Sequence, residues 1–310
     1  EAQKRLGIIP GDAPFPDGSQ NPLLRSWSEL SEEEKRVAAR SMASYSAMIE
    51  SQDYHIGTLL NYRRETGHLD NTLVIYLSDN GGEGRDVRGE LSDPMAANWI
   101  NRSFSQDFRD IGNGDYFAFI GTDFAYAVNG GLSWWKWFIG EGGVRVPLIV
   151  VPPKNRDFAH AAQKTDAFVS VKDIPMTILD YAGVPHPGAS YKGRTLAQPS
   201  GLSMRDYLEG SMDQPRTEED WYAFELFGNS YVVAGDYKAI RVRTGMYGDG
   251  KWHLYNIRSD PGETQPLDEA DPERLKQLIA IYDRFAEDKG IVPVADNWNP
   301  WHGFLDEEDL

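Results

Sequence analysis

Cysteine is absent from the sequence of 310 residues, and this absence excludes several kinds of chemistry. The chain can form no disulfide, no thiolate metal site and no cysteine nucleophile of its own. Long apolar runs are absent as well, since none approaches the ~18–20 residues that a bilayer-spanning helix requires. We therefore expect no membrane partner.

Positive charge is scarce, because 31 Lys and Arg stand against 48 Asp and Glu and give a formal net charge of −17. Nucleic-acid binding needs concentrated Lys and Arg at the phosphates, so we expect no nucleic-acid partner. An anionic substrate would meet an unfavourable long-range field. Any anion site must therefore be locally positive, through a metal ion or a well-placed Lys.

Apolar residues are plentiful: 40% of the chain is hydrophobic and 12% aromatic, which predicts a sizeable core. Ser31 and Glu34 form a capping-box pattern before a long helical period. The apolar runs 71–78 and 144–151 predict strands of a parallel sheet, buried on both faces, and 171–182 predicts a helix. This alternation indicates an α/β fold.

The last third of the chain has a different pattern. Short strand-like runs are joined by turns that carry Gly or Asp, at 222–227, 230–234, 238–243 and 252–257. A helical period follows over 272–289. We predict a small antiparallel sheet with one covering helix, so that 1–215 forms an α/β core and 216–310 a self-contained α+β subdomain.

Asp79 and Asn80 directly follow the first predicted strand, within the sequence Ser-Asp-Asn-Gly-Gly. Ligands of open α/β sheets bind beyond the carboxyl ends of strands, and two glycines let the chain turn sharply there. A carboxylate beside an amide oxygen suits a hard divalent cation such as Ca²⁺ or Mg²⁺. The alternative is a polar turn, for which Asp-Asn-Gly is equally suited.

Lys136 lies within a Gly- and aromatic-rich stretch, 81–143, that is too long for an ordinary connection. Its neighbours are Trp134, Trp135 and Trp137. An ammonium at the edge of an aromatic wall would bind an aromatic anion, although a lone Lys is usually a solvated surface group and the tryptophans could equally belong to the core. Arg145 is interpreted as a structural charge paired with Glu141.

Three segments occur in the order SDNG after NTLVIYL, then KWFIGEGGVRVP, then GDYKAIR through WHLYNIRSDPGE. Together they resemble formylglycine-dependent bacterial arylsulfatases of the Pseudomonas type, which belong to the alkaline-phosphatase-like superfamily. The resemblance runs from about Ser41 to Gly290. It implies that this chain is the carboxy-terminal part of an alkaline-phosphatase-like α/β sandwich with its small subdomain.

The resemblance also implies residue roles. Asp79 and Asn80 match the family's carboxy-terminal pair of Ca²⁺ ligands, with Mg²⁺ as the alternative ion, and Lys136 matches the Lys that contacts the substrate sulfate. The implied activity is that of a sulfuric ester hydrolase, which splits aryl sulfate esters at a formylglycine nucleophile. The metal would stabilise the charge that develops in the transition state.

The nucleophile motif C/S-x-P-x-R of the family's amino-terminal half is absent from this chain, as are the family's paired Asp metal ligands. We therefore expect a fragment or split product, inactive alone, whose partner is the missing amino-terminal half that carries the formylglycine. The sequence begins without Met and shows no signal peptide, so we expect the natural start upstream and leave the compartment open between bacterial periplasm and cytoplasm. Because two predicted strands are too few for a sheet covered on both faces, the sheet around 73–77 should expose an apolar face or an open edge.

Two other functions stay open. A phosphonate monoester or phosphodiester hydrolase of the same superfamily would use a similar Ca²⁺–Lys site, because sulfate and phosphate esters share tetrahedral geometry. A non-catalytic sulfatase-like module would lack the nucleophile half altogether. An in-frame upstream sequence with C-x-P-x-R would rule out the module.

Overall fold

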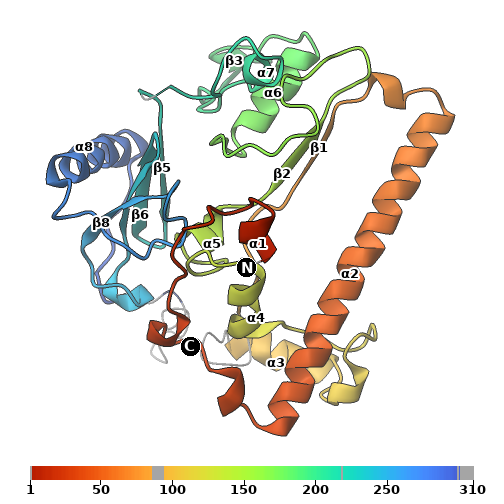
Figure 1. The fold of residues 1–310 in the computed structure, drawn as a ribbon, viewed down its shortest axis with the longest axis vertical. Helices are drawn as coiled ribbons and strands as arrows, with labels where there is room; N and C mark the ends of the chain where they lie inside the picture. The colour runs from red at the N-terminus through yellow and green to blue at the C-terminus, as the bar shows by residue number, and fades with distance from the viewer. Residues whose placement is uncertain (1, 86–93, 218, 299, 301–310) are drawn as a thin grey trace. The chain divides into compact units, whose positions relative to one another are not determined.

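The computed structural model describes residues 2–85, 94–217, 219–298 and 300 (Figure 1). The chain divides into two compact units. Unit 1 comprises 1–58, 80–146 and 221–310, and unit 2 comprises 59–79 and 147–220. Short helical elements lie at α1 (Ala2–Arg5), η1 (Gly18–Gln20), η2 (Trp27–Glu29), η3 (Leu69–Asn71), η4 (Phe108–Asp110) and η5 (Thr244–Met246).

The long predicted helix is confirmed as α2 (Glu32–Glu65). Its predicted cap is also present, because Ser31 N donates to Glu34 Oε2 (2.8 Å) and Glu34 N donates to Ser31 Oγ (3.2 Å). Large apolar side chains on α2 are exposed, among them Tyr54 at 71% and Tyr62 at 61%. Among the described residues no helix is long and apolar enough to cross a membrane.

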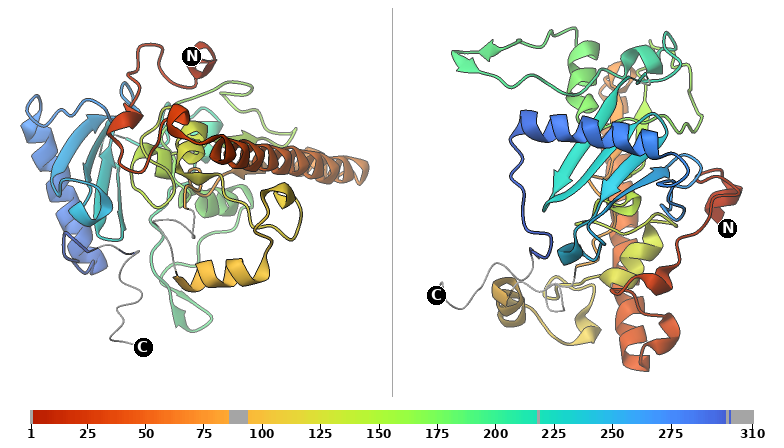
Figure 2. Two further views of the ribbon diagram at one scale, coloured as in Figure 1. Left: turned by 90° about the horizontal axis from the view of Figure 1, so that it is seen from below. Right: turned by 90° about the vertical axis from the view of Figure 1, so that its left-hand side faces the viewer.

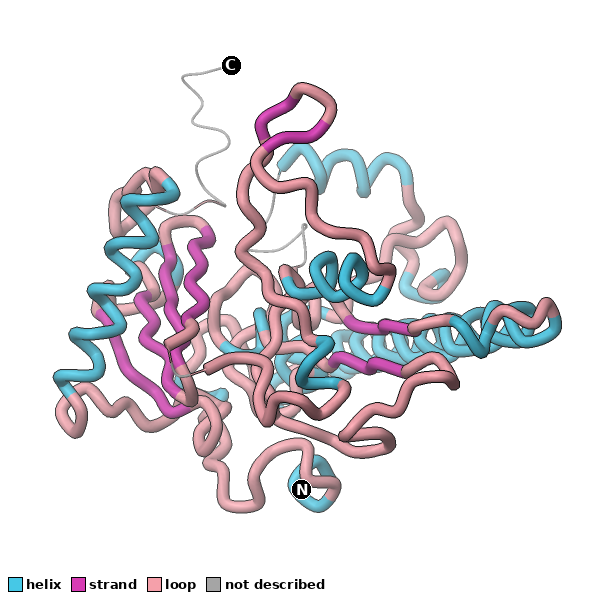
Figure 3. Tube along the Cα trace, turned by 90° about the horizontal axis from the view of Figure 1, so that it is seen from above, coloured by secondary structure: helices cyan, strands magenta, loops and turns pink. Residues whose placement is uncertain are grey.

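Unit 2 contains both predicted buried strands, as β1 (Val74–Leu77) and β2 (Leu148–Val151), which lie side by side in Figure 3. Their predicted parallel arrangement is wrong: they pair antiparallel, with Leu77 opposite Leu148. Burial on both faces is wrong too, since Ile149 is 55% exposed. A continuous apolar run reports neither the direction of its neighbour nor whether a covering layer is present. The apolar face expected on this sheet is indeed exposed.

The remainder of unit 2 surrounds α6 (Asp173–Tyr181), which confirms the helix predicted over 171–182. It also holds α7 (Arg205–Leu208) and the short antiparallel pair β3 (Ser190–Tyr191) and β4 (Arg194–Thr195). The buried carboxylate of Asp173 accepts a bidentate pair of hydrogen bonds from Arg216, at 2.7 and 2.8 Å. It also accepts from the main-chain nitrogens of Ser170 (2.7 Å) and Leu202 (2.8 Å), so this one side chain joins the start of α6 to the segments at Leu202 and Arg216.

In unit 1 the predicted antiparallel sheet is confirmed, with strand order β5-β6-β7-β8 in the described part of the chain. The strands are β5 (Trp221–Leu226), β6 (Asn229–Ala234), β7 (Tyr237–Arg241) and β8 (Trp252–Asn256). The covering helix is α8 (Pro272–Lys289), which lies along one face of the sheet in Figure 2. Leu278 and Tyr282 of α8 pack on Val232 and Leu254 of the sheet, which forms a core at this face.

The aperiodic stretch 81–143 also belongs to unit 1, and its residues 86–93 lie outside those that the structure describes. It contains helices that the sequence pattern did not predict: α3 (Pro94–Ser103), α4 (Gly121–Val128) and the single turn α5 (Glu141–Val144). The second strand therefore begins at Leu148 rather than at 144. Buried Ala125, Trp135, Phe138 and Met246 form a second core here.

Candidate functional site

Asp79 and Asn80 follow β1 after one intervening residue, Ser78, and the chain passes from unit 2 to unit 1 between them. Asp79 is exposed and Asn80 half-buried, with Asn80 Nδ2 donating to Gly81 O (2.9 Å). One carboxylate and one amide oxygen fit a hard-cation site, but only as two of the roughly 6–8 oxygens that Ca²⁺ takes. The described residues contain no group of three or more His, Asp or Glu that could hold a metal. The metal assignment of Asp79 and Asn80 stays a prediction.

The glycines that follow Asn80 allow backbone to pack directly on backbone. Gly81 N donates to Gly143 O (3.1 Å), and a Cβ added at Gly81 would lie 1.7 Å from Gly142 O. A Cβ at Gly142 would in turn lie 2.2 Å from Trp134 O. Because any side chain at these positions would collide with main-chain atoms, glycine is required to bring the Asn80 and Lys136 segments together.

Lys136 lies against this same segment. Its main-chain nitrogen donates to Gly82 O (3.0 Å), and its Nζ forms an ion pair with Glu83 Oε2 at 2.9 Å. The side chain is 33% exposed, and Nζ lies 5.4 Å from the centre of the Trp137 ring. Lys136 is therefore a partly buried, paired cation. Its proposed role toward a sulfate stays a prediction.

Glu83 orients the residues around Lys136, although the sequence interpretation did not single it out. Besides pairing with Lys136, its carboxylate accepts from Trp137 Nε1 (2.8 Å) and from Arg85 N (2.9 Å). The signal that could have revealed Glu83 is its place directly after Asp79-Asn80-Gly81-Gly82. An acidic group there opposes an incoming anion unless it has a cation to neutralise.

Asn129 was likewise not predicted. It follows α4, accepts from Gly82 N at its Oδ1 (3.0 Å) and donates from Nδ2 to Trp134 O (2.8 Å). One amide side chain thereby joins the segment after Asn80 to the segment that carries Lys136. Asn129 could have been recognised in the sequence from the pattern Asn-Gly-Gly, which is typical of the end of a helix.

The tryptophans beside Lys136 do not share one environment: two pack in the core, and one lies beside the ammonium of Lys136. Trp135 is fully buried in the core, and Trp134 stacks on Phe138 with ring centres 4.4 Å apart. Trp137 instead lies beside the ammonium of Lys136. Trp134 and Trp137 have positive φ angles of 64° and 82°. Such conformations cost bulky residues about 1–3 kcal/mol each and persist only where surrounding contacts enforce them.

Arg145 is a structural charge, as predicted. Its guanidinium lies 3.7 Å from Glu141 Oε2, and Nη1 donates to Ile257 O (3.2 Å).

Comparison with curated proteins places these residues in a family context. The family profile described as Sulfatase matches residues 12–184. An uncharacterized sulfatase of Schizosaccharomyces pombe is 35% identical over 300 residues, which cover 96% of this chain and 52% of that protein. An arylsulfatase of Klebsiella aerogenes is 27% identical over 202 residues, or 65% of this chain and 41% of that protein. The chain thus spans about half the length of these relatives.

Solved structures agree at the level of the fold. The crystal structure of Ps i-CgsB in complex with k-i-k-neocarrahexaose matches 94% of this chain and 51% of its own, with a TM-score of 0.53 and 18% identity. The Bacteroides thetaiotaomicron structure described as BT33336S-sulf matches 76% of this chain and 43% of its own, with a TM-score of 0.52 and 19% identity. The predicted α/β fold class, that of the alkaline-phosphatase-like sandwich, is confirmed.

Proposed function

Because the chain belongs to the sulfatase family, we propose that it supplies part of the active site of an enzyme that hydrolyses aryl sulfate esters to a phenol and sulfate. One observation carries this proposal: Lys136 is held against the segment that follows Asn80, through its hydrogen bond to Gly82 O. In a chain of net charge −17, a cation fixed against the segment that follows Asn80 is what an anion site requires. The ring of Trp137 beside Lys136 supports an aryl group on the ester.

In this proposal Asp79 and Asn80 hold a Ca²⁺ ion, with Mg²⁺ as the alternative. When bound, the ion supplies positive charge to the sulfate oxygens. Lys136 adds a point charge to one sulfate oxygen, and its desolvation by Trp137 strengthens that interaction. Glu83 holds the ammonium in place until an anion competes for it.

We further propose that the nucleophile, a formylglycine, lies in an amino-terminal half that completes the enzyme. The chain spans about half the length of its curated relatives, which leaves room for such a part. The exposed apolar residues of β2 and α2, among them Ile149, Tyr54 and Tyr62, support it, because large apolar side chains left in water favour a covering partner. In our proposal that half covers these surfaces.

The test is to assay the complete protein that contains this chain with an aryl sulfate and with an aryl phosphonate monoester side by side. We expect calcium-dependent release of sulfate that EDTA abolishes and added Ca²⁺ restores. Preferential cleavage of the phosphonate would transfer the proposal to the phosphonate monoester hydrolases. No cleavage of either ester, by a folded protein whose gene encodes no upstream C-x-P-x-R, would favour the non-catalytic module.

A further inference from the structure

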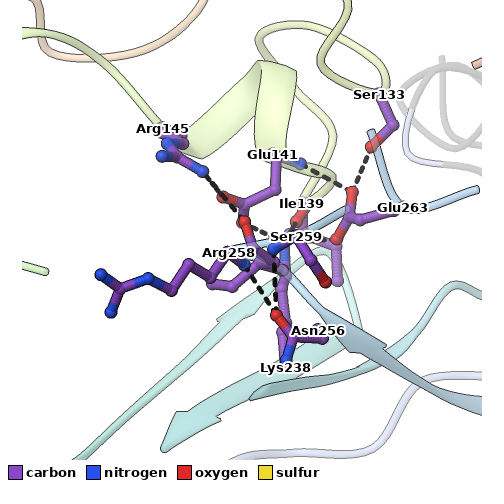
Figure 4. A network of polar contacts seen from close by, with 10 residues as sticks. Ser133, Ile139, Glu141, Arg145, Lys238, Asn256, Arg258, Ser259 and Glu263 are labelled. Carbon is purple, nitrogen blue, oxygen red and sulfur yellow. Dashed lines mark hydrogen bonds and ion pairs between the residues drawn. The ribbon is translucent and has the colours of Figure 1, made fainter. Parts of the chain in front are cut away.

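Lys238 of β7 is a buried cation that the proposed reaction does not use. Its side chain has no exposed surface, and Nζ donates to Ile139 O (2.8 Å) and Glu141 Oε1 (2.9 Å), as Figure 4 shows. The same Nζ forms an ion pair with Glu263 Oε1 at 2.8 Å. These hydrogen-bonding and ionic partners lie either in the segment that follows Lys136 or in the turn after β8, and Nζ also lies 4.8 Å from the centre of the Tyr231 ring in β6.

Glu263 joins both ends of the segment that contains Lys136, residues 133–143. Its Oε2 accepts from the main-chain nitrogen of Glu141 (2.8 Å) and from the hydroxyl of Ser133. Glu263 itself has a positive φ of 53°, which costs a residue other than glycine free energy. The turn after β8 is therefore shaped to present this carboxylate to the 133–143 segment.

The two carboxylates of this cluster, Glu141 and Glu263, share the fully buried ammonium of Lys238, and the partly exposed guanidinium of Arg145 lies 3.7 Å from Glu141 Oε2. Burial, and then the neighbouring Glu141, raise the pKa of Glu263, although Lys238 opposes this. Burial lowers the pKa of Lys238, but the attraction of Glu141 and Glu263 outweighs it, so the pKa is raised and the side chain stays charged. Well-packed apolar residues often stabilise such a position as well or better. We therefore interpret the cluster of Lys238, Glu141 and Glu263 as one that fixes geometry rather than one that adds stability.

The backbone of segment 133–143, which this cluster contacts, is strained. Trp134 and Trp137 flank Lys136 and both adopt positive φ angles, of 64° and 82°. The contacts of Glu263 fall at Ser133 and Glu141, on either side of this strained stretch. Releasing them would let the backbone relax and move the Lys136 side chain.

We propose that Lys238, Glu141 and Glu263 are positioning residues, which hold segment 133–143 in the strained conformation that presents Lys136 beside Glu83. The carboxy-terminal sheet then acts as the support for the anion site. This inference rests on the proposed function for the role of Lys136. The inference that the cluster holds segment 133–143 in place does not depend on the proposed function.

The first experiment measures hydrogen exchange of the complete protein by mass spectrometry. In Glu263→Ala, which removes the acceptors for Ser133 and the Glu141 amide, exchange in the 133–143 peptide should rise at least about tenfold, and peptides from β5 to β8 should change little. Glu263→Gln keeps an acceptor oxygen and should restore most of the protection. The matched control is Glu269→Ala, at an exposed carboxylate of unit 1.

Unchanged exchange at 133–143 in Glu263→Ala would overturn the proposal. Should that variant lose protection throughout the sheet, Ser133→Ala decides, because it removes one contact and leaves both ion pairs of Lys238 in place. A rise in exchange at 133–143 in Ser133→Ala supports the proposal. Unchanged exchange at 133–143 in Ser133→Ala overturns it.

The second experiment connects the segment to Lys136. Glu263→Ala should lower kcat/KM for an aryl sulfate about tenfold in the native background and have almost no effect once Lys136 is Ala, because both substitutions remove the same positioned charge. An equal loss in both backgrounds would show that Glu263 acts through general stability and overturn the positioning role. If the native protein has no sulfatase activity, the proposed function fails by itself, and the exchange data alone decide whether the segment is held.

Discussion

The main-chain nitrogen of Lys136 donates a hydrogen bond of 3.0 Å to the main-chain oxygen of Gly82. Because both partners are backbone atoms, the bond survives substitution of the lysine side chain. Charge at this position can therefore be removed without displacing the segment. The side chain's own partner, Glu83, lies one residue beyond Gly82.

Replacing Lys136 with Ala should lower kcat/KM for an aryl sulfate by about 10²–10³-fold in the complete enzyme, the usual loss when one group that stabilises transition-state charge is removed. Thermal stability should change little, because the ion pair with Glu83 is partly exposed and such pairs contribute about 0–1 kcal/mol. Lys154→Ala is the control, since Lys154 is an exposed lysine paired with exposed Asp70. Native turnover in Lys136→Ala would remove Lys136 from the site.

Replacing Asp79 with Ala should weaken Ca²⁺ binding to the complete protein by at least about tenfold, the lower end of the losses found for residues around metal sites. Asn80→Ala should have a smaller effect, because it removes a neutral ligand rather than a charge. Isothermal titration calorimetry measures both. Asp70→Ala, at an exposed aspartate of unit 2, should leave affinity unchanged. Native affinity in Asp79→Ala would contradict the metal assignment.

Gly81→Ala should destabilise the protein by about 1–3 kcal/mol or more, because its Cβ would lie 1.7 Å from Gly142 O and the backbone must shift. Gly57→Ala is the opposite case. It lies within α2 with nothing within 4 Å of the added Cβ, so it should stabilise by about 0.4–1 kcal/mol. Denaturant unfolding measures both, and equal effects would contradict the close packing at Gly81.

His253 should make stability depend on pH. Its Nδ1 lies 2.7 Å from Asp268 Oδ2, and Nε2 lies 3.1 Å from Asp249. Burial lowers the pKa of His253, but the hydrogen bonds to Asp268 and Asp249 prevail and raise it above 6.5. The folded state therefore binds this proton more tightly than the unfolded state does. The resulting stabilisation is fully present below about pH 6.5 and is lost as pH rises through the folded pKa.

His253→Asn removes this titration. The melting temperature of the native protein should exceed that of the variant by more at about pH 6 than at about pH 8.5. A difference between the two proteins that does not change with pH would show that the two aspartates do not favour the protonated ring.

Arg216→Met should destabilise the protein by about 3–5 kcal/mol, because it leaves the buried carboxylate of Asp173 without its cation. Arg258→Met is the control, since Arg258 pairs with Asp236 at the surface and such a pair contributes about 0–1 kcal/mol. Comparable losses in the two variants would contradict the central place of Asp173 in unit 2.

The carboxy-terminal sheet and helix were predictable because their signals are local. Gly228 and Gly235, with φ of 76° and 56°, make the turns between consecutive strands. Asp271 caps α8 by accepting from Arg274 N, and Gly290 ends it with a φ of 64°. The buried ion pairs of this sheet with residues 139–141 were not predictable, because the partners are about a hundred residues apart in sequence.

The same distinction applies to the site. Asp79, Asn80 and Lys136 were predicted from residue chemistry and family resemblance and stay predictions, whereas Glu83 and Asn129 make contacts that only the fold creates. The antiparallel direction of β1 and β2 is likewise a non-local fact. The comparisons show the sulfatase family, and the finer assignment to its bacterial Pseudomonas type stays a prediction.

The antiparallel register of β1 and β2 has a consequence for how such proteins can diversify. Leu77 stands opposite Leu148, so the intervening residues leave and re-enter the sheet at the same end. These residues, 78–147, form one insertion, here called the cassette, whose two ends are both fixed by the β1–β2 pair. Lengthening a closed loop is inexpensive, at about 0.6 kcal/mol for each doubling. Insertions at exposed tips of this cassette can therefore reshape what the molecule recognises, while the strand pair that anchors it keeps its register.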